Sequence, residues 1–323
     1  MKTKALICSS IVMSSLCAIV AAPGANAAAF PDDKKIVEFV VHMPTGSGAG
    51  LFMLTAGELL NRNGIMKSKI QVMSKPGGSS AVALNYVDSK KGDPYYPMMW
   101  TTSNLMAMNR GTTTMKFNEA TWLSTMIQDG NVLMVPYNSP YKSVADMIQD
   151  AKADPKKISV GINSVGGSEH IMATRIERVA GVRLNATAFE FSPTQLIGGH
   201  IHMAFGNTSE SAGHVQAKRV RVIANMGDVR LPYYKDIPTL KEQGVDASFT
   251  QYRGFVAGAN MPAEAVKVWD EALAKLSKTK EWAEFMAKND YMNAYKNSAE
   301  TKAFLQGYNQ ELLKDLKQME ENK

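Results

Sequence analysis

The sequence predicts an α/β protein in which mostly parallel sheets are flanked by helices and divided between two domains. Strand-like and helix-like segments alternate along the chain, an order that builds parallel sheets with helices on both faces. About 296 of the 323 residues remain after a removable leader, and this length exceeds one comfortable core. We expect a signal peptide over 1–27, a first domain over 28–131 and 254–323, and a second over 132–253.

The elements follow in order from hydrophobic periodicity. Short β-branched or apolar runs predict strands over Ile36–Met43, Ile70–Met73, Pro97–Thr101, Val132–Pro136, Ile158–Ile162, Ile201–Phe205 and Val220–Ala224. Apolar residues at helical spacing predict helices over Leu51–Asn61, Ala81–Ser89, Val144–Ala153, Ile171–Ala180, Ala263–Ser277, Glu281–Lys288 and Ala299–Glu321. The last helix carries an apolar stripe that is expected to pack onto the first domain: Phe304, Leu305, Tyr308, Leu312, Leu316 and Met319. The chain is expected to cross to the second domain near Asn131 and to return near Gln251–Gly254.

The N-terminus is typical of a secretory signal peptide. Lys2 and Lys4 precede an uncharged apolar run from Ala5 to Ala22, and Ala25-Asn26-Ala27 is a small-x-small cleavage pattern. Cleavage after Ala27 and release into the periplasm are expected. A transmembrane anchor is the alternative, but the run has only the minimum length for a span and contains four serines.

Composition narrows the class of protein further. Cys8 and Cys17 both lie in the leader, so the exported chain forms no disulfide and no thiolate metal site. Loss of Lys2 and Lys4 lowers the formal charge from +6 to +4. A mild positive charge suits an anionic ligand. No cluster of basic and aromatic residues points to nucleic acid, and we expect a monomer.

Three glycine-rich turns each follow a predicted strand and precede a predicted helix: Pro44–Gly50, Lys75–Ser80 and Ser164–Ser168. Glycine permits close approach of a ligand to the backbone, and a helix N-terminus offers free N–H groups with partial positive charge. In open α/β sheets such loops lie at the carboxyl ends of strands, where ligands bind. Plain strand-to-helix turns are the alternative for any one of them.

The sequence lacks the patterns of the common enzymes and cofactor sites. Leu51 stands where a dinucleotide fingerprint beginning at Gly46 needs its third glycine, and no Gly-Lys-Ser/Thr follows to make a P-loop. HExxH and GxSxG are absent, and Glu210 has no evident acid–base partner. His200 and His202 share one strand face without a third metal ligand. We therefore expect no cofactor, no metal and no enzymatic activity.

Further polar residues are candidates for ligand contact. His170 begins a predicted helix just beyond the turn Ser164–Ser168, where the alternative is a solvent-facing residue. Arg253 lies near the expected return between domains and is a candidate bidentate clamp for a carboxylate, with a surface salt bridge as the alternative. Ser103, just beyond a predicted strand, is included among the expected contacts.

Four segments together resemble the periplasmic receptors of tripartite tricarboxylate transporters, also called Bug receptors. They are HMPTGSGAG from His42, SKPGGSSAVALNYV from Ser74, the run from Asn138 to His170, and the run from Arg219 to Val245. The resemblance covers nearly the whole exported chain. It implies a two-domain periplasmic binding protein of type II, a Venus flytrap, that holds a carboxylate and delivers it to membrane permease subunits.

Carried over to this sequence, the resemblance assigns ligand contacts to three segments. The residues are Thr45, Gly46, Ser47 and Gly48 in the first loop, Ser164, Val165, Gly166, Gly167 and Ser168 in the second, and Asn207, Thr208, Ser209 and Glu210 with Arg253 elsewhere. A di- or tricarboxylate, or an aromatic carboxylate, is the expected ligand. A ligand-sensing accessory protein of a membrane kinase is the second hypothesis, and a periplasmic hydrolase is the third.

The chain departs from the family pattern at two places. The segment SPTQL between Phe191 and Ile197 is shorter than the family's Lys-Gly-Gly loop and following turn. Gly50 stands where the family loop usually has Asp. An Asp in the first turn of a helix caps free amides and complements the helix dipole. Gly50→Asp is therefore expected to stabilise the empty protein slightly and to weaken anion binding.

Overall fold

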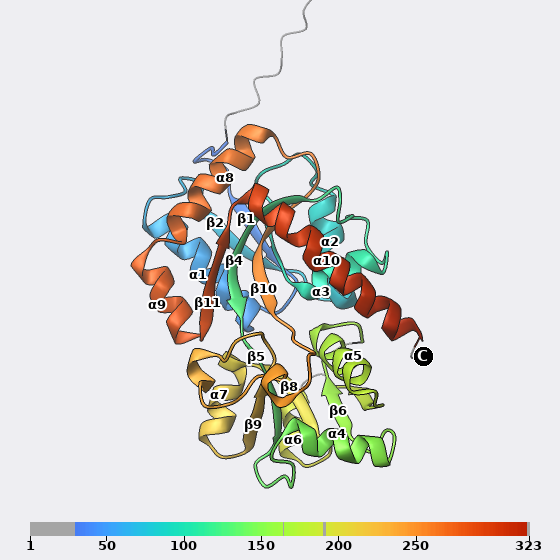
Figure 1. Ribbon diagram of the computed structural model, residues 1–323. Coiled ribbons are helices and arrows are strands. Elements are labelled where there is room, and N and C mark those ends of the chain that lie inside the picture. Colours follow the sequence, from blue (N-terminus) through green and yellow to red (C-terminus); the bar gives the residue numbers. More distant parts are fainter. Residues whose placement is uncertain (1–29, 164, 190–191, 322–323) are drawn as a thin grey trace, which may run out of the picture.

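Two lobes, each built on its own sheet, make up the protein (Figure 1). The computed structural model describes residues 30–163, 165–189 and 192–321, so the expected signal peptide lies outside the described residues. The first lobe contains a six-stranded sheet in the order β11-β4-β10-β3-β1-β2, and the second a five-stranded sheet in the order β7-β6-β8-β5-β9. Helices flank both sheets, which confirms the expected α/β class.

The first sheet is parallel where strand–helix–strand units build it. β1 (Val37–Val41) lies parallel to β2 (Ile70–Ser74) and to β3 (Met98–Trp100). β10 (Gln251–Ala257) is antiparallel to β3 and to β4 (Thr121–Asp129), because it enters from the other lobe. β11 (Tyr291–Lys296) closes the edge antiparallel to β4. The sheet is therefore mixed, with a parallel part formed by its earliest strands.

The second sheet has the same mixed character. β6 (Ser159–Ile162) is parallel to β7 (Asn185–Ala188) and to β8 (Met203–Asn207). β5 (Asn131–Pro136) is antiparallel to β8 and to β9 (Val220–Asn225). β5 runs against its neighbours because it leads the chain away from the first lobe.

The chain passes between the lobes in two places. β4 ends at Asp129 and β5 begins at Asn131, so Gly130 alone separates the two sheets. The return follows β9 and ends where β10 begins at Gln251. The expected domain division after 131 and after 253 lies beside these passages and stays a prediction.

Helices cover both faces of each sheet. In the first lobe, α1 (Gly48–Arg62), α8 (Ala263–Leu276) and α9 (Lys280–Lys288) share one buried apolar cluster with the sheet. A second cluster contains residues of α2 (Ala81–Asp88), α3 (Thr102–Asn109), α4 (Val144–Ala153), α5 (Ser168–Ala180) and α10 (Ser298–Glu321). α6 (Ser192–Ile197) and α7 (Thr208–Gln216) cover the remaining face of the second lobe. The second cluster is continuous between the lobes, so the lobes share an apolar contact.

The stripe on α10 packs more widely than expected. Leu305, Leu312 and Met319 are buried within the cluster that both lobes share. α10 contacts β4 and α3 of the first lobe and also α5 of the second. The C-terminal helix thus bridges the lobes instead of covering the first one alone.

Candidate functional site

The carboxyl ends of the parallel strands of both sheets face the passage between the lobes. β1, β3 and β4 run in one direction, and β4 ends at Asp129, directly before the crossing. In the second lobe, Asn207 at the end of β8 pairs with Asn131 at the start of β5. The helices that follow β1, β3, β6 and β8 therefore begin near this passage, which is the position that α/β sheets use for ligands.

The first loop supplies free amides at the N-terminus of α1. Ser47 is the N-cap, and its hydroxyl accepts from the Gly50 amide at 3.2 Å and donates to the Pro44 carbonyl at 2.7 Å. The amides of Gly48 and Ala49 have no intrahelical acceptor, because they lie in the first turn. Thr45 and Gly46 are exposed. The loop thus offers backbone donors, while the Ser47 hydroxyl shapes the turn.

The structure reverses the stability expected for an acidic residue at position 50. A Cβ on Gly50 would lie 2.2 Å from the Thr45 carbonyl oxygen and 2.5 Å from the Thr45 Cα. These are backbone atoms, so the loop itself must shift to admit any side chain. The expectation that Gly50→Asp stabilises the empty protein is wrong, because capping and dipole effects of about 0.3–1 kcal/mol do not offset this overlap.

The second loop already uses the polar groups of Gly166. Its amide donates to Nδ1 of His170 at 3.0 Å, and its carbonyl accepts from Nη1 of Arg110 at 3.1 Å. Gly166 has a φ of +76°, which favours glycine. Arg110 is the C-cap of α3 in the first lobe, so this contact spans the two lobes. His170 holds the loop, and Arg110 was not among the residues expected from the sequence.

The start of α5 has no side-chain cap at its N-cap residue, Gly167. Ser168 is buried, and Val165 is 61% exposed. Burial raises the pKa of Glu169, in the first turn, while hydrogen bonds from its own amide, Ser168 and Asn163 oppose the shift. Ser164 lies outside the described residues. An acidic side chain therefore already occupies part of this helix N-terminus.

The other expected contacts begin helices at the same passage. Ser103 is half-buried in the first turn of α3. Asn207 is the N-cap residue of α7, and its side-chain oxygen accepts from Nδ2 of Asn131 at 2.9 Å. The backbone amide of Thr208 donates to the Gly130 carbonyl at 3.2 Å. Ser209 follows in α7, and its side chain is outside the described part of the chain. These residues tie α7 to the crossing point.

Arg253 is buried in β10, with 3% of its surface exposed. Its Nη2 donates to Asp129, which is also buried, and its guanidinium lies 5.4 Å from the ring centre of Tyr291. Asp129 is therefore the carboxylate with which Arg253 pairs in this structure. Nearby His42 is buried, and burial followed by the charge of Arg253 lowers its pKa to about 4.

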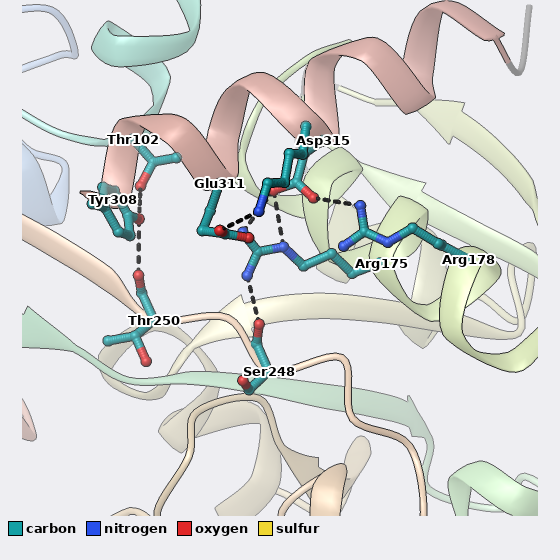
Figure 2. A network of polar contacts seen from close by, with 9 residues as sticks. Thr102, Arg175, Arg178, Ser248, Thr250, Tyr308, Glu311 and Asp315 are labelled. Carbon is teal, nitrogen blue, oxygen red and sulfur yellow. Dashed lines mark hydrogen bonds and ion pairs between the residues drawn. The ribbon is translucent and has the colours of Figure 1, made fainter. Parts of the chain in front are cut away.

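A polar network on α10 joins elements from both lobes (Figure 2). Buried Asp315 accepts from Arg175 of α5 at 2.6 Å and from Arg178 at 3.3 Å, and Arg175 also donates to the carbonyl of Ser248 at 2.6 Å. Tyr308, on the same helix, donates to the carbonyl of Thr250 at 2.9 Å. The network fixes α5, which carries the second loop, against α10 and the returning segment.

Groove size alone does not locate the site. Two grooves of about 330 and 450 Å³ lie side by side on the second lobe and share Lys152 between α4 and α5. Neither is lined by the loops at the carboxyl strand ends. His202 contacts Ser159, with 2.7 Å between Nδ1 and Oγ. The described residues contain no group of three or more metal-ligating side chains.

Two α/β lobes whose helix N-termini gather where the sheets' carboxyl ends meet define the class of two-lobed solute-binding folds. Similar solved structures have this fold. A TctC solute binding protein from Polaromonas has 22% identity and a TM-score of 0.73, covering 90% of this chain and 99% of that chain. A Rhodopseudomonas palustris protein, MatC with bound malate, has 13% identity and a TM-score of 0.74, covering 88% and 98%.

Sequence comparison gives the family. The model of the tripartite tricarboxylate transporter family receptor matches residues 60–318. A UPF0065 protein of Cupriavidus necator is 25% identical over 253 residues, 76% of each chain. BugT of Bordetella pertussis is 18% identical over 215 residues, 64% of this chain and 65% of that protein. The chain belongs to the tripartite tricarboxylate transporter receptor family, as the resemblance implied.

Proposed function

We propose that this protein is a periplasmic receptor that captures a small organic carboxylate between its lobes and presents it to the membrane permease of a tripartite tricarboxylate-type transporter. The observation that carries the proposal is the N-terminus of α1, which follows β1 and whose first turn contains the amides of Gly48 and Ala49 without intrahelical acceptors. Amides at a helix N-terminus bind anions without a counter-charge of their own.

The arrangement supports binding in preference to catalysis. Micromolar affinity needs about 8 kcal/mol, and hydrogen bonds to a charged group contribute about 1.5–3 kcal/mol each before ordering costs. Four to six donors from the loops at the strand ends therefore suffice. Two titratable side chains at the passage already have structural partners, since His170 accepts from the Gly166 amide and Asp129 pairs with Arg253.

Periplasmic location rests on the leader and on the relatives. A related structure is that of the periplasmic binding protein BugD, with a TM-score of 0.76 at 16% identity. No helix among the residues that the structure describes is long and apolar enough to cross a bilayer. Intact-mass measurement of a periplasmic extract should find a chain that begins at about Ala28. A full-length chain in the membrane fraction would contradict export.

A thermal-shift screen tests the binding itself. A bound carboxylate at 100 times its dissociation constant should add about 2.7 kcal/mol to the free energy of unfolding. The screen should include di-, tri- and aromatic carboxylates, with NMR of each responding compound to show that it is not consumed. A Rhodopseudomonas palustris relative of 20% identity has been solved with adipate, so adipate belongs in the panel. No response to any carboxylate would overturn the proposal, and turnover of a responding compound would favour a hydrolase.

A further inference from the structure

The side chain of Arg110 extends from the first lobe to the second, where it contacts the expected ligand loop before α5. It caps the C-terminus of α3 in the first lobe, and its Nη1 donates to the Gly166 carbonyl in the second lobe at 3.1 Å. The approach is close, because a Cβ on Gly166 would lie 2.0 Å from the same Nη1 atom. The absence of a side chain on Gly166 therefore makes room for the guanidinium.

Among the side chains that the structure describes, no carboxylate is ion-paired with Arg110. Buried Arg253 pairs with Asp129, and half-buried Arg175 pairs with Asp315. Half-buried Arg221 instead donates to three backbone carbonyls. Arg110 is half-buried, and this burial lowers its pKa. A partly desolvated cation gains more from an arriving anion than one in water does.

The guanidinium has donors to spare. It carries five N–H groups in a planar fork that matches a carboxylate, and one of these bonds Gly166. The remaining donors can therefore bind an anion while the contact with the second lobe persists. Arg110 would then contact the second lobe and the anion at the same time.

Arg110 and the first loop are anion sites of different kinds. The α1 N-terminus offers neutral amides from Gly48 and Ala49, whereas Arg110 offers a full charge. Arg110 directly follows α3, so it lies about 10 Å along that helix from Ser103. Glu169 adds a carboxyl group to the start of α5, and a second anion there needs a cation beside it.

We propose that Arg110 binds one carboxylate of a dicarboxylate ligand whose other carboxylate lies at the α1 amides. The inference rests on the proposed function and narrows it, because Arg110 makes the receptor select ligands charged at both ends. A monocarboxylate of the same length fills one site only and forgoes the guanidinium.

Calorimetry with matched pairs of acids tests the assignment. Succinate and adipate are each compared with the monocarboxylate of the same length, butyrate or hexanoate, on the wild-type protein and on Arg110→Gln. The wild type should prefer one dicarboxylate over its monocarboxylate by about 10- to 100-fold, as expected for a lost charge-assisted pair. Arg110→Gln should remove that preference and leave monocarboxylate affinity within about threefold. Arg110→Lys should retain part of it, because it keeps the charge without the fork.

Arg219→Gln is the matched control. Arg219 is exposed before β9, at the end of the second sheet opposite the passage, so its loss changes the net charge equally. It should leave all four affinities unchanged. Unchanged dicarboxylate preference in a folded Arg110→Gln, or equal losses in both variants, would overturn the assignment of Arg110. A wild type that binds none of the four acids would instead count against the proposed function.

Discussion

Replacement of Gly50 by Ala tests how the first loop is built. An ordinary Cβ contact lies at 3.4–4 Å, whereas a Cβ here would lie 2.2, 2.4 and 2.5 Å from the carbonyl oxygen, carbonyl carbon and Cα of Thr45. More than an ångström of overlap must be relieved by movement of the backbone between Thr45 and the Ser47 cap. Overpacking of this kind costs about 1–3 kcal/mol, and the greater helix propensity of Ala returns about 1 kcal/mol. A net loss of up to about 2 kcal/mol is expected.

The assay is urea denaturation followed by circular dichroism, with calorimetric titration of a bound carboxylate. Gly307→Ala is the control, because Gly307 lies in α10 and nothing is within 4 Å of the added Cβ. It should gain about 0.5–1 kcal/mol from helix propensity alone. Gly50→Ala should also weaken binding, because the amides of Gly48 and Ala49 follow the displaced turn. A Gly50→Ala protein at least as stable as wild type would show that the loop admits a Cβ without strain.

Substitutions at three other places test the first loop, a buried histidine and the polar network on α10. Gly46→Val should fold normally, because nothing lies within 4 Å of a Cβ added at Gly46. It should nevertheless abolish carboxylate binding, because the valine methyl groups would cover the loop amides. Retained affinity in calorimetry would place the binding site elsewhere. The pKa of His42 is lowered to about 4, so as the pH falls the unfolded state binds a proton at this side chain before the folded state does. The free energy of unfolding should therefore fall by up to about 3 kcal/mol between pH 7 and pH 4. Denaturation curves across this range should show a smaller pH dependence for His42→Asn, and an identical pH dependence in the two proteins would contradict this. Asp315→Asn should lower the free energy of unfolding by about 3–5 kcal/mol, because it leaves the partly buried Arg175 without its anion. The control is Glu311→Gln, whose exposed pair with Lys314 contributes less than about 1 kcal/mol. Equal effects of the two variants would rule out a stabilising network.

The sequence predicted those elements whose side chains alternate or repeat clearly. The helix over Val144–Ala153 has the predicted bounds, and β1 and β9 lie within the expected runs or one residue from them. β4 was missed, since its interior residues are buried on both faces and show no alternation. α3 was missed because Leu105, Met106, Ala107 and Met108 are all buried, which erases an amphipathic stripe.

The sequence predicted the positions of the loops at the candidate site, but not the partners of its charged side chains. Glycines after strands located both loops, because the strand-to-helix turn is a local pattern. The environments of Arg110 and Arg253 depend on contacts 56 and 124 residues apart. The neighbouring residues in the sequence do not distinguish the environment of Arg110 from that of Arg253. The arrangement of the lobes buries Arg253 against Asp129 and leaves Arg110 at the second loop.

Competitive capture from a mixture shows whether the protein selects a carboxylate. The exported protein is incubated with an equimolar pool of carboxylates, amino acids and sugars, recovered by gel filtration and unfolded, and the released molecules are identified by mass spectrometry. One carboxylate, chemically unchanged and near one per protein, should be retained by the wild type and lost from Gly46→Val. Retention of a molecule without a carboxylate, or equal retention by the two proteins, would contradict the account.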